Sequence, residues 1–165
     1  MPERPASTLI GNKIKTGRTI QFYRKVDNGR GAEMSEYHID LDPVHSVIRL
    51  TITSEIMTLE CAQEIHKRLT ELSSSGGPYA AIFDLSLVKG TTIPTDMIRG
   101  LARNRPSISM GRPHVIVGEE PVIFGLARLF QMCGEAVNKE HEVVHTLEEA
   151  YEIVKARPED FTQRL

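Results

Sequence analysis

Histidine is the residue type that first suggests chemistry in this chain, because six histidines occur among its 165 residues. A protein metal site brings three or four ligands close together. His141 and His145 share one face of a predicted strand, but at that spacing they lie roughly 13 Å apart, too far to hold one ion. No HxxH or HExxH motif occurs, and the other four flank a turn or stand alone: His38, His45, His66 and His114. We therefore predict no metal site.

Nucleophilic catalysis needs a nucleophile beside a base, and the sequence shows no such pair. It has no GxSxG motif, no lysine within an apolar run and no cysteine next to a suitable histidine. Cys61 and Cys133 fall within predicted helices and outside any CxxC motif, which is typical of buried free thiols. Gly76-Gly77 lacks the lysine and hydroxyl residue of a phosphate-binding loop. We predict a protein that is not an enzyme and has no cofactor; an enzyme with scattered catalytic residues is a third hypothesis.

The candidate binding residues lie where a predicted central strand ends and the next helix begins. Asp84 ends this strand, at the position where α/β folds place many ligand sites. The stretch after it offers hydroxyls and free N–H groups to an anion or a partner, with Lys89 nearby: Thr91, Thr92, Thr95 and Asp96. The structural interpretation, which we favour for each residue taken alone, is that Asp84 braces its loop and that Thr92 or Thr95 caps the helix.

Arg128 is a further candidate binding residue, because it lies in an otherwise apolar predicted helix between Leu126 and Leu129. By helical spacing it falls near Gly125, where another surface has room to approach. Arg128 would then contact a ligand head group or a neighbouring subunit. The alternative is that its apolar stem lies along the helix while its charge reaches the solvent.

The elements that position these residues follow from the hydrophobic pattern, which predicts strands at 37–42, 47–53, 79–85, 114–117 and 143–144. The first two would form a hairpin whose first strand is half-buried, and 79–85 is typical of a central strand covered on both faces. Helices are expected after Thr58, from Pro94, after Glu120 and behind a capping box formed by Thr146 and Glu149. We expect an α/β fold with a mostly parallel sheet of four to five strands, an antiparallel edge strand and about four helices.

This regular pattern defines one domain at 36–157, followed by a short C-terminal tail at 158–165. We expect residues 1–35 to form a basic arm that is partly ordered or makes an extra hairpin. Residues 1–33 carry seven basic and three acidic side chains, a net charge of +4, whereas the remainder carries −6. The arm would either dock on the acidic body or contact a phosphate-bearing partner.

The order of elements over residues 36–156 resembles that of STAS domains, the superfamily that contains the anti-sigma-factor antagonists. The run 80–88, followed by a loop and a helix, is similar to the strand–loop–helix core of that family. The resemblance implies a regulatory protein-interaction module. The serine that partner kinases phosphorylate in this family has no counterpart here, since the corresponding stretch 91–96 offers only Thr91, Thr92 and Thr95. The segment 124–130 looks like an uncharacterised bacterial branch, for which ligand or lipid binding is implied by analogy.

The net charge and the hydrophobicity of the chain limit the kinds of partner that we expect. The net charge of −2 and the pI of about 6.3 give no case for nucleic acid. No apolar run approaches the roughly 20 residues of a spanning helix, and the N-terminus lacks the form of a signal peptide, so we expect a cytoplasmic protein without a membrane span. The leading hypothesis is a module that binds a protein partner or its own copy through the loop after Asp84 and the helix 93–103. The alternative is a carrier whose apolar pocket, guarded by Arg128, holds a small apolar or acidic ligand.

Overall fold

The computed structural model describes residues 36–106, 111–134 and 141–165. The basic arm or hairpin expected at 1–35 lies outside the described residues. The strands are β1 (Tyr37–Asp42), β2 (Val47–Ile52), β3 (Ile56–Met57), β4 (Ala80–Asp84), β5 (Gly90–Thr91), β6 (His114–Val117), β7 (His141–Val144) and β8 (Gln163–Arg164). The helices are α1 (Leu59–Ser75), α2 (Thr95–Arg103), α3 (Pro121–Gly134) and α4 (Leu147–Val154), with a short 3-10 helix, η1, at Pro158–Asp160.

The main sheet has six strands in the order β7-β6-β4-β2-β1-β8. Strands β2, β4, β6 and β7 are parallel, whereas β1 runs antiparallel to both β2 and β8. The predicted α/β class, the mostly parallel sheet and the four helices are therefore confirmed. The expected count of four to five strands is too low, because β8 extends the sheet from the segment that we expected to be a tail.

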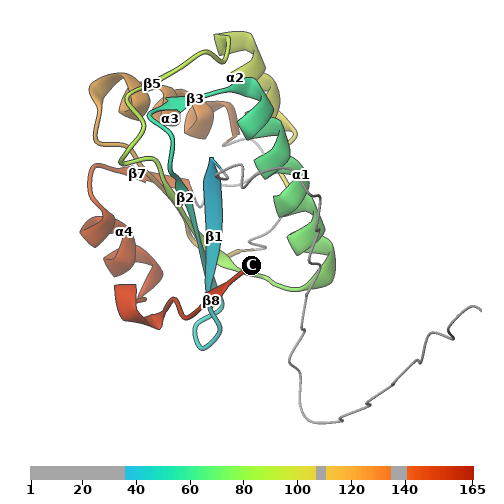
Figure 1. The fold of residues 1–165 in the computed structure, drawn as a ribbon, viewed down its shortest axis with the longest axis vertical. Coiled ribbons are helices and arrows are strands. Elements are labelled where there is room, and N and C mark those ends of the chain that lie inside the picture. The colour runs from blue at the N-terminus through green and yellow to red at the C-terminus, as the bar shows by residue number, and fades with distance from the viewer. Residues whose placement is uncertain (1–35, 107–110, 135–140) are drawn as a thin grey trace, which may run out of the picture. The chain divides into compact units, whose positions relative to one another are not determined.

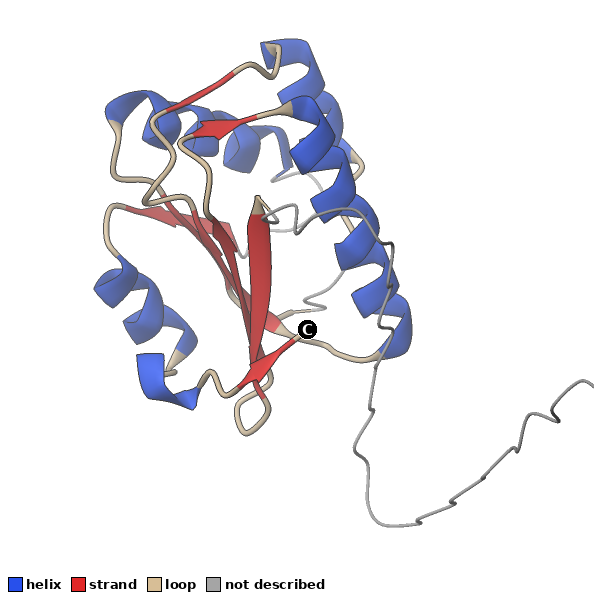
Figure 2. Ribbon diagram, in the orientation of Figure 1, coloured by secondary structure: helices blue, strands red, loops and turns tan. Residues whose placement is uncertain are grey.

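Helices cover both faces of the sheet, with α4 on one side and α1, α2 and α3 on the other (Figures 1 and 2). Alternate residues of each strand serve the two faces. The α4 face gathers one core cluster: Val47, Ala80, Ile82, Val115, Val117, Ala150, Tyr151, Val154 and Ala156. A second core cluster lies on the face under α1 and includes Ile48, Leu50, Ile52, Ala81, Ile65, Leu69 and Leu72.

The prediction that β1 is half-buried is wrong. Asp40 and Asp42, which alternate with the apolar residues of β1, are both buried. The Asp40 carboxylate lies 3.2 Å from Nη2 of Arg49 and 3.1 Å from Nε of Arg164, so strands on both sides supply it with positive charge. The two aspartates of β1 are therefore buried, although they alternate with apolar residues, instead of facing the solvent.

The helix starts confirm two predictions and correct a third. The hydroxyl of Thr58 accepts a hydrogen bond from the N–H of Cys61, and Thr146 and Glu149 form the reciprocal capping box. Helix α2 differs, because Pro94 is its N-cap residue and no side chain caps it. The expectation that Thr92 or Thr95 caps this helix is therefore wrong.

A second, two-stranded parallel sheet joins β3 to β5 beside the carboxyl ends of the main strands. It fixes the loop after β4, since Lys89 and Gly90 donate their N–H groups to the carbonyl of Glu55. Across the described ranges, no helix has the length and apolarity required to cross a bilayer.

Candidate functional site

A cavity of about 180 Å³ lies between the sheet and the three helices α1, α2 and α3. Its wall is almost entirely apolar and comes from every layer on that side: Leu50, Ile52, Ala62, Ile65, Leu69, Phe83, Ile98, Leu101, Ile116, Ile123, Leu126, Ala127 and Phe130. Cavities of comparable size that are lined by aliphatic and aromatic side chains accept benzene-sized ligands. The cavity therefore has the size and the wall of a small-ligand site.

Two histidines of the sheet interrupt this apolar wall. Ala81, His114 and His141 occupy paired positions on β4, β6 and β7, so both imidazoles project from the face of the sheet that α1, α2 and α3 cover. Both side chains line the cavity, and the residues are only 3% and 4% exposed. Their ring nitrogens have no hydrogen-bond partner among the residues that the structure describes. Buried polar atoms without a partner are rare in folded proteins, so this pair is a candidate for ligand contact.

The two rings carry no charge at neutral pH. Burial, followed by repulsion from His141 and Arg105, lowers the pKa of His114 to about 3. Burial, followed by the charge of Arg105, lowers the pKa of His141 to about 4. A neutral imidazole offers one N–H donor and one acceptor, so this part of the wall can hydrogen-bond to a ligand without adding charge.

Arg105 supplies the positive charge that the histidines lack. It follows α2, and its side chain lines the cavity together with Pro106. Its Nη2 donates a 2.9 Å hydrogen bond to the carbonyl of Gly134 at the end of α3. Burial lowers the pKa of this guanidinium, but an arginine side chain is not deprotonated in proteins and so keeps its charge. One end of an apolar cavity therefore combines a cation with two neutral imidazoles.

Of the predicted site residues only Thr91 lines the cavity, and the predicted residues do not form one site. Asp84 is buried at the carboxyl end of β4, where its Oδ1 accepts from the N–H and the hydroxyl of Ser86 at 3.1 and 2.6 Å. The hydroxyl of Thr91 donates to the carbonyl of Met57 and accepts from the N–H of Ile93. These contacts brace the loop between β4 and α2.

Thr92, Thr95 and Asp96 lie exposed around the start of α2. Lys89, whose ammonium was expected near an anion there, forms an ion pair with Glu55. The start of α2 is therefore accessible, but the nearby cation is already paired.

Arg128 does not line the cavity. It is exposed on α3, and its Nη1 donates a 2.7 Å hydrogen bond to Oε1 of Gln131. Gln131 in turn donates to the carbonyl of His141. Arg128 thus matches the alternative interpretation, in which its charge reaches the solvent. Its connection to His141 of the cavity wall is indirect, through the side chain of Gln131.

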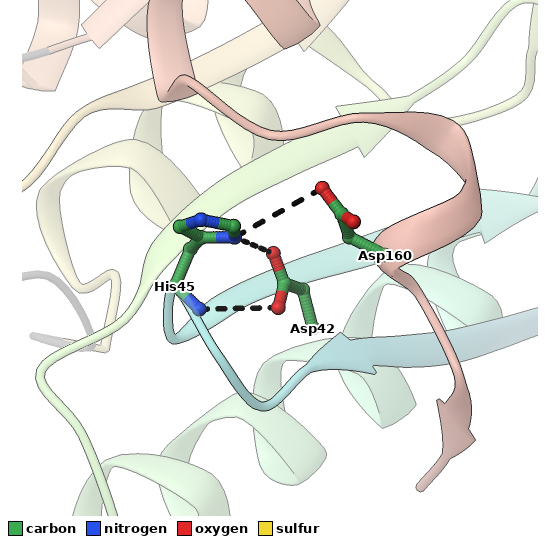
Figure 3. Close-up of side chains that lie close together, drawn as sticks. All are labelled: Asp42, His45 and Asp160. Atoms are coloured by element: carbon green, nitrogen blue, oxygen red, sulfur yellow. Dashed lines mark hydrogen bonds and ion pairs between the residues drawn. The ribbon is translucent and has the colours of Figure 1, made fainter.

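A second polar cluster joins the β1–β2 turn to η1 (Figure 3). Nδ1 of His45 lies 2.6 Å from Oδ2 of Asp42 and 3.9 Å from Oδ2 of Asp160. The three side chains could offer ligand atoms to a metal ion. Their oxygens are already engaged, however, since Asp42 accepts from the N–H groups of Val44 and His45, and Asp160 pairs with Arg157. The cluster therefore serves as a clamp between the turn and η1.

The described cysteines give no sign of an activated nucleophile. Cys61 is buried in α1, and burial together with hydrogen bonding to Glu36 raises the pKa of its thiol to about 12. A thiol of that pKa is protonated at neutral pH and is a poor nucleophile.

A comparison with protein-family models finds no match for this chain, and a comparison with curated proteins finds none either. Sequence reasoning placed Thr91 of the cavity wall among the candidates but missed Arg105, His114 and His141. His114 was predicted to stand alone, and Arg105 was not among the candidate residues. The signal available in the sequence is that His114 begins a predicted strand and that His141 shortly precedes the next one.

Proposed function

We propose that this α/β domain is a non-catalytic binding protein whose ligand is a small, largely apolar molecule held between the sheet and helices α1, α2 and α3. The observation that carries the proposal is the apolar cavity of about 180 Å³ with polar atoms at one place in its wall. Small-molecule sites combine an apolar wall with a few polar groups that orient the ligand, and this cavity has both features.

The size of the cavity limits the ligand to one ring or a short branched chain. A cavity of about 150 Å³ lined by leucine, isoleucine and phenylalanine holds benzene. A long acyl chain needs more room than that, so the lipid implied by analogy with the bacterial branch is not favoured.

The absence of catalysis remains part of the proposal. In the described part of the chain, the residues with chemical potential are engaged in structural contacts or lie apart from one another. Asp84 braces its loop, Cys61 is protonated, and His45 belongs to the clamp with Asp42. The two histidines of the cavity have no nucleophile beside them in the wall.

The proposal is tested with toluene as a neutral probe of the cavity. We expect toluene to shift the methyl NMR signals of Ile123 and Leu126 and to raise the melting temperature of the protein. In Ala127→Leu, a buried side chain of the wall grows into the cavity, so affinity should fall by about tenfold or more. Arg128→Leu places the same new side chain one residue along, on the exposed side of α3, and should bind toluene as the parent does.

Absence of any methyl shift in the parent at saturating toluene would exclude this cavity as a binding site. Equal loss in both variants would instead indicate a general effect on α3. Native mass spectrometry of protein isolated without denaturation gives a second reading, because a tightly retained ligand adds its mass to the chain.

Self-association through α2 is the second candidate function, and the resemblance to STAS domains favours it. The supporting observation is that Met97 is exposed on α2 beside the exposed Thr92, Thr95 and Asp96. Met97→Glu and Asp96→Arg would then each lower the fraction of dimer in a sedimentation series over protein concentration. A chain that stays monomeric over the whole series would rule this candidate out.

A further inference from the structure

The polar part of the cavity wall indicates what kind of head group the ligand carries. Three side chains from three elements meet the cavity there, namely Arg105 after α2, His114 on β6 and His141 on β7. The imidazole rings of the two histidines lie edge to face with their centroids 4.7 Å apart. Phe83 and Phe130 pack against them, with centroids 5.7 Å from His114 and 6.5 Å from His141. The polar atoms are thus enclosed by aromatic and aliphatic groups.

The charge at this place favours an anion over a metal ion. Two imidazoles alone make an incomplete metal site, and in the described ranges the only cluster of three ligand side chains is the distant clamp at Asp42, His45 and Asp160. The guanidinium of Arg105 repels a cation, and its charge already acts on both rings. Anions, in contrast, gain from the guanidinium and from the N–H donors of the rings.

The end of α3 is shaped to keep the guanidinium in place. Gly134 is buried, and a Cβ atom at this position would lie 2.9 Å from Cζ of Arg105 and closer still to its Nη1. The carbonyl of Gly134 also accepts the hydrogen bond from Nη2. Any side chain at 134 would displace the guanidinium, so the helix end and the arginine form one unit.

We propose, on the basis of the binding function above, that the ligand is a small monocarboxylate whose carboxylate meets Arg105, His114 and His141 while its single ring or short chain fills the apolar cavity. The guanidinium supplies the countercharge, and each neutral imidazole donates one N–H to a carboxylate oxygen. The apolar wall excludes acids whose tail carries further charges.

The experiment compares three probes of similar size, namely benzoate, its neutral analogue benzamide, and toluene, by NMR titration at neutral pH. We expect benzoate to bind the parent at least tenfold more tightly than benzamide. Arg105→Met should weaken benzoate binding by about 30-fold while toluene affinity changes little. Arg103→Met is the matched control, because Arg103 is exposed on α2 and does not line the cavity.

Two further readings separate a head-group role from a loss of folding. Gly134→Ala leaves the arginine in the chain but displaces its guanidinium, so benzoate affinity should fall and toluene affinity should persist. In the parent, benzoate should shift the ring ¹⁵N signals of His114 and His141, and toluene should shift them much less.

The outcomes distinguish this inference from the binding function on which it rests. Toluene binding without any preference for benzoate over benzamide would overturn the proposal that the ligand carries a carboxylate, while the apolar binding site would still be supported. Failure of all three probes would overturn both. Benzoate affinity that is unchanged in Arg105→Met and in Gly134→Ala would also overturn the assignment of the head group.

Discussion

His114 and His141 face each other across neighbouring parallel strands, with their ring centroids 4.7 Å apart and their planes at 86°. They are register partners on β6 and β7, and each begins its strand. Both residues are buried, and their ring nitrogens have no partner among the described residues. Two adjacent groups that both resist protonation make the stability of the domain depend on pH.

We predict that stability falls as the pH drops below about 6.5. The pKa values of His114 and His141 in the folded protein are about 3 and 4, below the ordinary imidazole value of about 6.5. Between 6.5 and 4 the unfolded chain therefore binds protons that the folded chain does not, and the unfolding free energy declines. At pH 5 the loss is about 2 kcal/mol for each ring.

Urea denaturation at several pH values measures this dependence, and NMR titration of the ring signals reports the two pKa values directly. The double variant His114→Phe, His141→Phe removes both groups beside a cavity that can accept the larger rings. Its unfolding free energy should vary less between pH 7 and pH 5 than that of the parent. Equal slopes for parent and variant would mean that other groups govern the acid response.

Much of the sheet could be predicted because the central strands β4 and β6 each contain a continuous apolar run. Continuous runs at 80–83 and 115–117 match β4 and β6, and the hairpin at 37–42 and 47–52 is also correct. Strands β3, β5 and β8 have two residues each, which is too short to show a period. The burial of Asp40 could not be predicted either, because Arg164 reaches it from the far end of the chain, and Tyr151 and Phe161, which are also distant in sequence, contact the Arg49 side chain beside it.

The candidate site was harder to predict from the sequence, because it depends on the register between strands and on the packing between the sheet and the helices. The first residues of two parallel strands lie side by side only if the strands start level, and periodicity does not specify this. Arg105 stands before Pro106, which marks a helix end without indicating where the side chain points. Asp84 and Thr91 were chosen by their place after the central strand, and the structure uses both to hold the loop.

The two arginines that contact Asp40 should contribute unequally to stability. Arg49 is largely buried, donates a 2.6 Å hydrogen bond to the hydroxyl of Tyr151, and lies 4.7 Å from the centre of the Phe161 ring. Arg164 is two-thirds exposed. We expect Arg49→Met to lower the free energy of unfolding by about 2 kcal/mol and Arg164→Met by less than about 1 kcal/mol. Chemical denaturation of both variants checks this order, and a reversed order would contradict it.

The clamp between the β1–β2 turn and η1 should depend on Asp42 more than on His45. Asp42 is fully buried, and its Oδ1 accepts from the N–H groups of Val44 and His45. Asp42→Ala leaves these donors without a partner and should cost about 1–3 kcal/mol. The ring of His45 is 45% exposed, so water can replace its contacts and His45→Ala should cost less. Thermal unfolding of both variants compares the two costs, and a larger loss in His45→Ala would assign the clamp to the imidazole instead.

We expect replacement by alanine to have opposite effects on stability at two glycines, one before α3 and one within it. Gly125 is exposed in the helix interior, and a Cβ there meets nothing within 4 Å. Gly125→Ala should therefore raise the unfolding free energy by about 0.5–1 kcal/mol, because alanine loses less backbone freedom on folding. At Gly118, between β6 and α3, a Cβ would lie 3.2 Å from the backbone nitrogen of Phe124. Gly118→Ala should destabilise the domain, because the helix must move to admit a methyl group. A second copy of the chain that packs closely at Gly125 would add a further effect. Gly125→Ala would then stabilise the monomer in denaturation experiments and lower the fraction of dimer in sedimentation. An unchanged sedimentation profile would show that no second copy contacts α3 at this position.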